Sequence, residues 1–172
     1  MFREFPYLYE GSLDYERNYL STYPKSADSI AVFLVDDDRV VGASTGLPMA
    51  AETSGFSHSV ILQGYNPESF FYCAESVLLP EYRGLGYYKI FINTRENHAR
   101  TLGMKYIGFC AVDRPPNHPM CPPNWRAPNA IWSHHGYRQN ESLKAQYRWR
   151  DIGESEESIH HLTYWIKRLV DH

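Results

Sequence analysis

The sequence contains no run of 18 or more apolar residues, so it offers no candidate membrane-spanning helix. It also lacks a long run of Lys or Arg, and its net charge is −3, unlike the basic surface of a nucleic-acid-binding domain. The first residues do not show the charged-then-apolar pattern of a signal peptide. We therefore expect neither a nucleic-acid nor a membrane partner, and we expect a cytoplasmic location.

Cysteine is scarce: Cys73, Cys110 and Cys121 form an odd number with no Cys-x-x-Cys pair. This pattern argues against a disulfide framework and a zinc knuckle, and we expect no metal. The 172 residues suit a single domain spanning 1–172, and 43% hydrophobic residues exclude a mainly disordered chain. Tyrosine is abundant, with 14 residues in an aromatic content of 15%, which suits a lined cleft as well as a core.

Hydrophobic periodicity predicts a mixed α/β domain. A helix begins near Ser12, and two strands at 30–35 and 40–45 form a hairpin around an acidic turn at 36–38. The later elements are a strand at 70–79, a helix at 87–102, a strand at 106–112, a short helix at 130–135, a strand at 143–150 and a helix at 158–169. The last helix is predicted from apolar residues at helical spacing, which are Ile159, Leu162, Trp165, Ile166 and Leu169.

A glycine turn joins the strand at 70–79 to the long helix that follows it. Gly84 and Gly86 lack a Cβ atom, so the backbone can approach a ligand closely. The first N–H groups of a helix have no partner within the helix, and with the helix dipole they form an anion site. Arg83 adds a cation. These residues predict a phosphate-bearing ligand, although a plain turn with an exposed arginine fits them as well.

Two common phosphate motifs do not match this turn. The Lys-Ser/Thr pair of a Walker loop is absent, and Lys89 stands where a Rossmann fingerprint needs its third glycine. The pattern Gln/Arg-x-x-Gly-x-Gly/Ala is matched at Arg83 and Gly86, but Tyr88 occupies its last position.

With its strand, turn and helix, the stretch 70–112 resembles motif A of the GNAT N-acetyltransferase superfamily. Arg114-Pro115, His118-Pro119 and Gly136-Tyr137 extend the likeness over nearly the whole chain, to one branch of bacterial GNAT proteins. The resemblance implies an α/β fold of the GNAT type, with a central, mostly antiparallel mixed sheet flanked by helices. The family usually begins with a strand and a helix for which the sequence leaves no room, so we expect the sheet to lack that first strand.

The resemblance implies an N-acetyltransferase, a GNAT-type acyltransferase (EC 2.3.1.-) that transfers the acetyl group of acetyl-CoA to an amine by direct attack in a ternary complex. The acceptor would be a small-molecule or peptide amine, and an uncovered edge strand would favour a homodimer. The alternative is a non-catalytic CoA-binding module, a sensor or a partner subunit. The cofactor-binding residues implied by the resemblance are Val77, Leu78, Leu79, Arg83, Gly84, Leu85, Gly86, Tyr87, Tyr88 and Asn129.

Glu75 is the best candidate for the catalytic base. It is the only charged residue in the strand at 70–79, and an attacking amine must be neutral, so a base nearby assists the reaction. The alternative is a structural carboxylate that is paired with a backbone or arginine group.

A proton donor is harder to assign. The family's usual tyrosine falls at Trp132, which has no labile proton to give. Tyr137 is our candidate, with His134, His135 and Tyr88 as alternatives, and each of these also has a plausible packing role.

Overall fold

The computed structural model describes residues 2–21 and 23–169. Its helices are α1 (Leu13–Leu20), α2 (Phe56–Leu62), α3 (Tyr88–Thr101) and α4 (Asn129–His134), with single-turn 3-10 helices at Tyr23–Lys25, Met49–Ala51, Pro67–Ser69 and Pro80–Tyr82. Its strands are β1 (Ile30–Asp36), β2 (Arg39–Pro48), β3 (Phe70–Leu78), β4 (Tyr106–Val112), β5 (Arg138–Trp149) and β6 (Ser158–Arg168). Among the described helices, none is long and apolar enough to cross a membrane.

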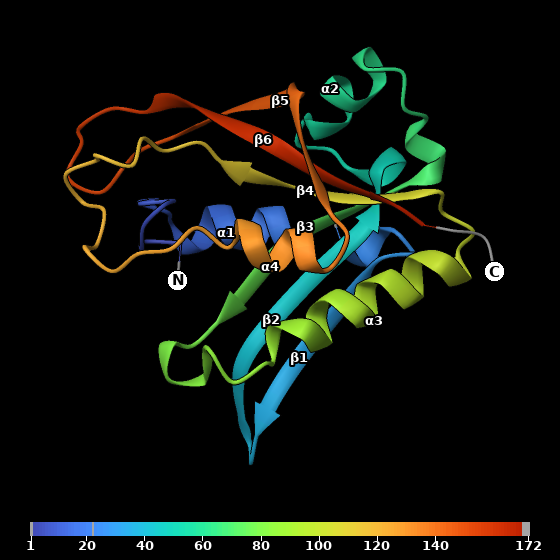
Figure 1. The fold of residues 1–172 in the computed structure, drawn as a ribbon, viewed down its shortest axis with the longest axis horizontal. Coiled ribbons are helices and arrows are strands. Elements are labelled where there is room, and N and C mark those ends of the chain that lie inside the picture. Colours follow the sequence, from blue (N-terminus) through green and yellow to red (C-terminus); the bar gives the residue numbers. More distant parts are fainter. Residues whose placement is uncertain (1, 22, 170–172) are drawn as a thin grey trace.

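The described strands form one six-stranded sheet in the order β1-β2-β3-β4-β6-β5 (Figure 1). Every neighbouring pair is antiparallel except β3 and β4, which are parallel. The predicted mostly antiparallel mixed sheet with flanking helices is therefore confirmed. Among the described residues before β1, the structure has α1, the 3-10 helix at Tyr23–Lys25 and one isolated bridge, between Tyr9 and Asp151, so in the described chain the sheet begins with β1.

The two parallel strands diverge soon after they begin. β3 pairs with β4 only where Phe70–Tyr72 lies beside Tyr106–Gly108, although both strands continue beyond these residues. On their outer sides β3 stays paired with β2 as far as Leu78, and β4 stays paired with β6 as far as Val112. The sheet therefore opens into a V between the carboxyl ends of β3 and β4 (Figure 1).

Helices cover the two faces of the sheet and create two cores. The α3-side core joins residues of α3 to both central strands and includes Phe71, Cys73, Ile92, Ala99, Ile107, Tyr137, Trp165 and Leu169. The α2-side core lies on the other face and includes Tyr23, Val60, Phe70, Tyr72, Leu143 and Tyr164. Alternate side chains of β3 enter opposite cores, because successive residues of a strand point to opposite faces.

The helix predicted at 158–169 is wrong, because this segment is strand β6. β6 lies between β4 and β5, and its residues 162–166 are buried without interruption. A strand that is buried on both faces is apolar at nearly every position. Its residues at helical spacing are therefore apolar too, and the sequence pattern resembles that of an amphipathic helix. Trp165 packs in the α3-side core while Tyr164 packs in the α2-side core, as alternation along a strand requires.

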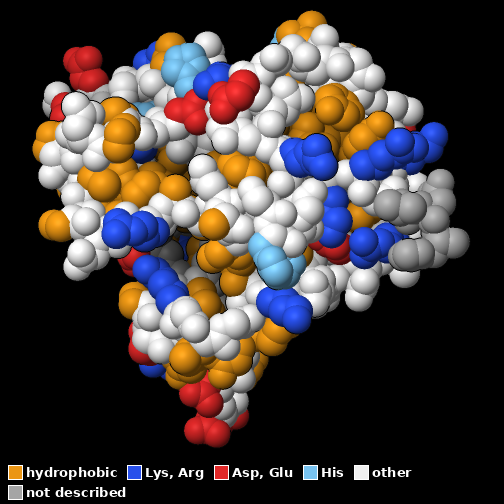
Figure 2. Space-filling view, in the orientation of Figure 1, with side chains coloured by type: hydrophobic (Ala, Val, Ile, Leu, Met, Phe, Trp, Pro, Cys, Tyr) orange, Lys and Arg blue, Asp and Glu red, His pale blue; other side chains and the backbone are white. Residues whose placement is uncertain are grey.

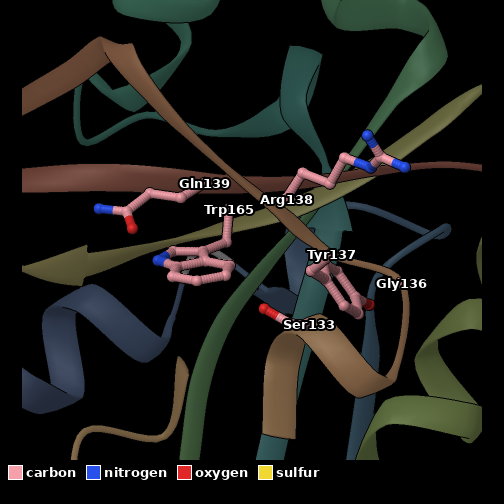
Figure 3. A pocket seen from close by; sticks show the side chains of 6 residues that line it. All are labelled: Ser133, Gly136, Tyr137, Arg138, Gln139 and Trp165. Carbon is pink, nitrogen blue, oxygen red and sulfur yellow. The ribbon is translucent and has the colours of Figure 1, made fainter. Parts of the chain in front are cut away.

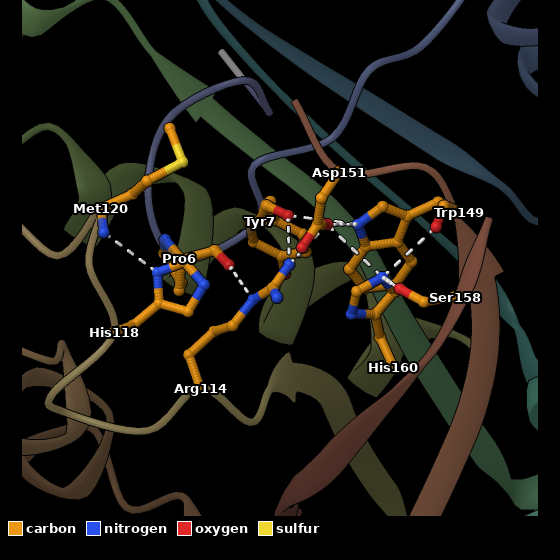
Figure 4. Close-up of polar contacts among 9 residues, drawn as sticks. All are labelled: Pro6, Tyr7, Arg114, His118, Met120, Trp149, Asp151, Ser158 and His160. Carbon is orange, nitrogen blue, oxygen red and sulfur yellow. Dashed lines mark hydrogen bonds and ion pairs between the residues drawn. The ribbon is translucent and has the colours of Figure 1, made fainter. Parts of the chain in front are cut away.

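The N-terminal segment is held against the sheet by a largely buried arginine (Figure 4). Arg114 donates from Nε to the carbonyl of Pro6 at 2.9 Å and from Nη2 to the carbonyl of Tyr7 at 2.9 Å. The same Nη2 forms an ion pair with Asp151 Oδ1 at 2.7 Å, and Trp149 Nε1 donates to that oxygen at 2.9 Å. Arg114 thus links the end of β4 to the start of the chain and to the turn after β5.

The β1–β2 hairpin projects from the rest of the molecule and ends in an acidic tip. The turn lies between Asp36 and Arg39, and Asp37 adopts a positive φ of 50° there. Asp and Asn tolerate this conformation better than most side chains do. Figure 2 shows carboxylates gathered at this lower end of the molecule.

Candidate active site

The glycine turn after β3 leads directly into α3, as the sequence predicts. Gly84 and Gly86 have φ values of +75° and +84°, which a residue without a Cβ atom adopts at little cost. The backbone N–H groups of residues 84–88 have no hydrogen-bond acceptor among the described residues, and no side chain caps α3. The 14-residue helix adds the positive end of its dipole at the same point. Five free donors around a helix start form a cradle suited to an anion.

Tyr88 does not fill this cradle. A Cβ atom built on Gly84 or Gly86 would meet no heavy atom within 4 Å, so the space beside the turn is open. The Tyr88 ring packs against the α3-side core, and its hydroxyl accepts a hydrogen bond from Trp132 Nε1 at 3.1 Å. The large side chain at this position therefore reaches toward α4 and leaves the backbone donors uncovered.

Arg83 already has an anionic partner within the chain. Its Nη1 and Nη2 donate to the two carboxylate oxygens of Glu4 at 2.6 and 3.1 Å, and its Nε donates to the carbonyl of Leu78 at 3.0 Å. The hydrogen bonds of this pair raise the pKa of Arg83 and lower the pKa of Glu4. The cation that the sequence places beside the turn is thus engaged with the N-terminal segment.

The three residues at the end of β3 differ in how much of their backbone is free. Val77 and Leu78 pair with β2 and lie on the V beyond its last β3–β4 pair. Leu79 donates its N–H to the carbonyl of Val41 at 2.9 Å and accepts from the N–H of Tyr82 at 3.0 Å. Asn129 is the exposed first residue of α4. In an antiparallel ladder hydrogen-bonded pairs alternate with non-bonded ones, so the Leu79–Val41 bond makes Val77 and Ala43 a hydrogen-bonded pair. Hence only Leu78 turns its backbone away from β2 toward the V, with its N–H free among the described residues and its carbonyl accepting from Arg83, whereas the backbones of Val77 and Leu79 are hydrogen-bonded within the protein.

A β-bulge determines where Glu75 points. Ser44 pairs with Ser76 and Gly46 pairs with Cys73, so β3 has one residue more than β2 between these pairs. The extra residue shifts the alternation of β3, and bulges commonly redirect side chains in this way. Glu75 consequently faces the α2 side of the sheet, whereas Cys73 packs in the α3-side core.

The Glu75 carboxylate is held by neutral hydroxyl groups. Tyr23 donates to Oε2 at 2.8 Å, and Thr45 Oγ1 donates to the same oxygen. The Tyr19 hydroxyl lies 3.3 Å from that of Tyr23 and extends the chain of hydrogen bonds. Burial, and after it the charge of Glu75, raises the pKa of both tyrosines, so both stay protonated. Glu75 itself is only partly buried, so solvent reaches a carboxylate that has been fixed in place.

A buried arginine supports the bulge from the opposite face. The Arg95 guanidinium, on α3, donates from Nη1 to the carbonyls of Thr45 and Glu75 at 3.3 and 3.2 Å. Its Nε donates to the carbonyl of Phe91, one turn earlier in the helix. Sequence analysis missed these partners of Glu75, because none of them is close to it in sequence and no local motif marks them.

Tyr137 lies on the other side of the sheet from Glu75. It is 2% exposed in the α3-side core, and burial raises its pKa well above the usual range. It contributes to the wall of a shallow cavity of about 480 Å³ between α4 and the start of β5 (Figure 3). Trp165 lines the same cavity. This burial favours a packing role for Tyr137 over the predicted role as a proton donor.

The proline-rich loop at residues 114–128, which follows β4, packs against the N-terminal segment. The Phe5 ring meets Trp125 edge-on at 4.9 Å between centroids and lies 5.8 Å from the ring of His118. His118 Nδ1 accepts from the N–H of Met120 at 3.2 Å, which fixes the imidazole in the loop (Figure 4). Within the described residues, no three His, Cys, Asp or Glu side chains gather as metal ligands would.

A family model described as the acetyltransferase (GNAT) family matches residues 2–122. The match covers the V, the glycine turn and Glu75. The chain belongs to the GNAT family. It is therefore an acetyltransferase by family, and the predicted resemblance is confirmed. Among curated protein sequences, none matches this GNAT chain at a significant level.

Solved structures of GNAT proteins share this fold at low sequence identity. A GNAT family acetyltransferase from Elizabethkingia anophelis, with acetyl-CoA bound, aligns with a TM-score of 0.57 and 8% identity over 94% of this chain and 86% of its own. The ribosomal-protein-alanine N-acetyltransferase of Brucella melitensis gives 0.57 and 13% over 92% and 80%. The IAA acetyltransferase of Bacillus cereus gives 0.56 and 12% over 94% and 88%. At such identities the likeness establishes the fold alone.

Proposed function

We propose that this GNAT protein is an acetyl-CoA-dependent N-acetyltransferase that acts on a small-molecule or peptide amine. The observation that carries the proposal is the juxtaposition of two features at one edge of the sheet. The V between β3 and β4 has unpaired strand edges, and the cradle at residues 84–88 presents five backbone donors beside it. An extended ligand with amide groups and a pyrophosphate needs both features.

The proposed cofactor contacts follow from this arrangement. The backbone N–H of Leu78 would bind an amide of the pantetheine arm, with Val77 lining the V beside it and Asn129 contacting the arm from α4. The donors of Gly84, Leu85, Gly86, Tyr87 and Tyr88 would bind the pyrophosphate. Arg83 would bind the pyrophosphate once its ion pair with Glu4 is broken. Leu79 would line the site without donating its N–H, which is already bonded to Val41. When bound, acetyl-CoA supplies the activated acetyl group.

Glu75 is the proposed base. Its carboxylate is held by Tyr23 and Thr45 and remains partly open to solvent, so it can take a proton from an acceptor ammonium directly or through water. Tyr88 is the better candidate for the residue that donates a proton, because it is only partly buried and its hydroxyl accepts a hydrogen bond from Trp132, which leaves its own proton free. Tyr137 is the weaker candidate, because its hydroxyl is buried.

The decisive experiment compares Glu75→Gln with the wild type and with Glu154→Gln, a control at an exposed position. Thermal shift with CoA measures binding, and CoA release from acetyl-CoA over a panel of amines measures turnover. We expect Glu75→Gln to bind CoA normally and to lose roughly 10²- to 10⁴-fold in kcat, the usual contribution of a positioned base. Glu154→Gln should match the wild type.

Two outcomes would contradict the proposal. Absence of CoA binding by the wild type would exclude the cradle as a pyrophosphate site. CoA binding without turnover of any amine would instead favour a non-catalytic CoA-binding module. Unchanged turnover by Glu75→Gln would remove only the assignment of the base.

A further inference from the structure

An apolar surface lies beside Glu75 on the same face of the sheet. Strand register places Phe33 opposite Ala43, and Ala43 opposite Val77, so these three residues form a row across β1, β2 and β3. Val35 follows two residues after Phe33 in the same strand and extends the row toward the hairpin tip. We call these four residues the Phe33 surface.

The face of this row is fixed by its neighbours. A Cβ atom on Gly42 would meet Leu78 and Phe91, so Gly42 points toward α3. Ala43 is the next residue and therefore points the other way, as do its partners across the ladder. Thr45 follows Ala43 on the same face and donates to the Glu75 carboxylate. The Phe33 surface and the proposed base thus share one side of the sheet, away from the cradle at residues 84–88.

The Phe33 surface is open. Phe33 is 60% exposed and Val35 is 58% exposed, although both lie within strand β1. Tyr19 of α1 contacts Tyr23 near Glu75, but no described residue packs over Phe33 in the two cores. A contiguous exposed apolar patch on a soluble domain marks a binding site more often than isolated exposed apolar residues do.

The charges around the Phe33 surface favour a cation. The Glu75 carboxylate lies at one end and has only neutral hydroxyl partners from side chains. The acidic turn from Asp36 to Asp38 lies at the other end. Arg39, the nearby cation of the hairpin, forms an ion pair with Glu81 at 3.7 Å. A ligand that suits this surface has an apolar body and a positively charged amine.

We propose that the Phe33 surface binds the apolar body of the acetyl acceptor, an alkyl or arylalkyl amine, with the amine directed to Glu75. The inference rests on the proposed function and specifies its substrate class. Phe33 acts as a specificity residue through contact with the part of the acceptor that does not react. Burial of its exposed ring against such a body supplies binding that a small polar amine cannot obtain.

Phe33→Ser tests the proposal, with Leu62→Ser as the matched control, because Leu62 is 71% exposed on α2. The acceptors are hexylamine, 2-phenylethylamine, ethanolamine and spermidine. For the two apolar amines we expect Phe33→Ser to raise KM about tenfold with little change in kcat, which matches burial of part of one aromatic side chain. KM for ethanolamine should not change, and Leu62→Ser should match the wild type throughout. Equal effects of Phe33→Ser on apolar and polar amines would overturn the proposal.

Amide NMR titration with hexylamine gives a readout that does not depend on turnover. Shifts confined to the residues of the Phe33 surface and to Thr45 would support the proposal even if acetyl transfer, and with it the proposed function, fails. Absence of shifts in a protein that does transfer acetyl groups would overturn it. Sedimentation of both variants addresses a second copy as the occupant, because a dimer that Phe33→Ser converts to monomer would assign this surface to self-association and overturn the proposal.

Discussion

Replacement of Arg114 by Met should destabilise the fold strongly. The Arg114 and Asp151 side chains are only 9% and 14% exposed, so the substitution would leave a carboxylate in a mostly buried site without its cation. It would also remove the donors to the carbonyls of Pro6 and Tyr7. Loss of one partner of a buried pair costs about 3–5 kcal/mol in general. Since Asp151 keeps the Trp149 donor, some solvent and the nearby His160 Nε2 at 3.4 Å, we expect about 3 kcal/mol at the lower end of that range.

Urea unfolding followed by tryptophan fluorescence measures this change, and calorimetry should show Tm lower by roughly 6–12 °C for a domain of this size. Arg148→Met is the control, because Arg148 and Glu157 form a pair at 3.9 Å with both side chains about 60% exposed. It should change the free energy of unfolding by less than about 0.5 kcal/mol.

The double variant Arg114→Met/Asp151→Asn separates two causes of the loss. It removes the unpaired charge and should recover part of the stability lost in Arg114→Met. A loss below about 1 kcal/mol in the single variant would refute the reasoning. If the double variant is no more stable than Arg114→Met, the loss of stability comes from the carbonyls of Pro6 and Tyr7 that lose their donor, and not from the unpaired Asp151 carboxylate.

Two further predictions concern titratable groups. Glu4→Gln should strengthen CoA binding about fivefold, because a surface pair of this kind is worth up to about 1 kcal/mol and Arg83 would become available to the pyrophosphate; calorimetric titration measures it, and weaker binding would show that Glu4 orients Arg83 productively. Burial lowers the pKa of His160, so the folded state takes up its proton at lower pH than the unfolded state does. Stability should therefore be complete above about pH 6.5 and decrease as the pH falls below that value. Between pH 7.5 and 5.5, Tm should decline less in His160→Gln than in the wild type. Parallel curves of Tm against pH for the two proteins would contradict the assignment of this decline to His160.

Local patterns predicted the elements that form from neighbouring residues. The hairpin at 30–48 was predictable because its acidic turn separates two apolar runs, and α3 because a glycine turn precedes it and Gly103 follows it. The cradle for an anion followed from the same turn, since helix ends leave their donors free in any sequence.

Features that depend on distant residues could not be predicted in this way. Because β6 is buried on both faces, its sequence shows the apolar spacing of a helix. Only its pairing with β4 and β5 identifies the segment as a strand. The orientation of Glu75 depends on a bulge opposite Thr45, and its hydroxyl partner Tyr23 lies 52 residues earlier. The pairing of Arg83 with Glu4 spans 79 residues. Sequence patterns report burial and local geometry, but they do not report which distant side chains meet.

The short contact between β3 and β4 divides the described sheet into two antiparallel halves, β1-β2-β3 and β4-β6-β5, joined at a seam of three residue pairs. Within each half, continuous rows of backbone hydrogen bonds join the strands, so we expect each half to unfold as one cooperative unit. The seam between the halves has few such bonds. A ligand bound in the V would contact both halves of the sheet and link them. Its binding energy would then add to the stability of the whole domain rather than to that of one loop, and slowed hydrogen exchange would extend to strands that the ligand never contacts.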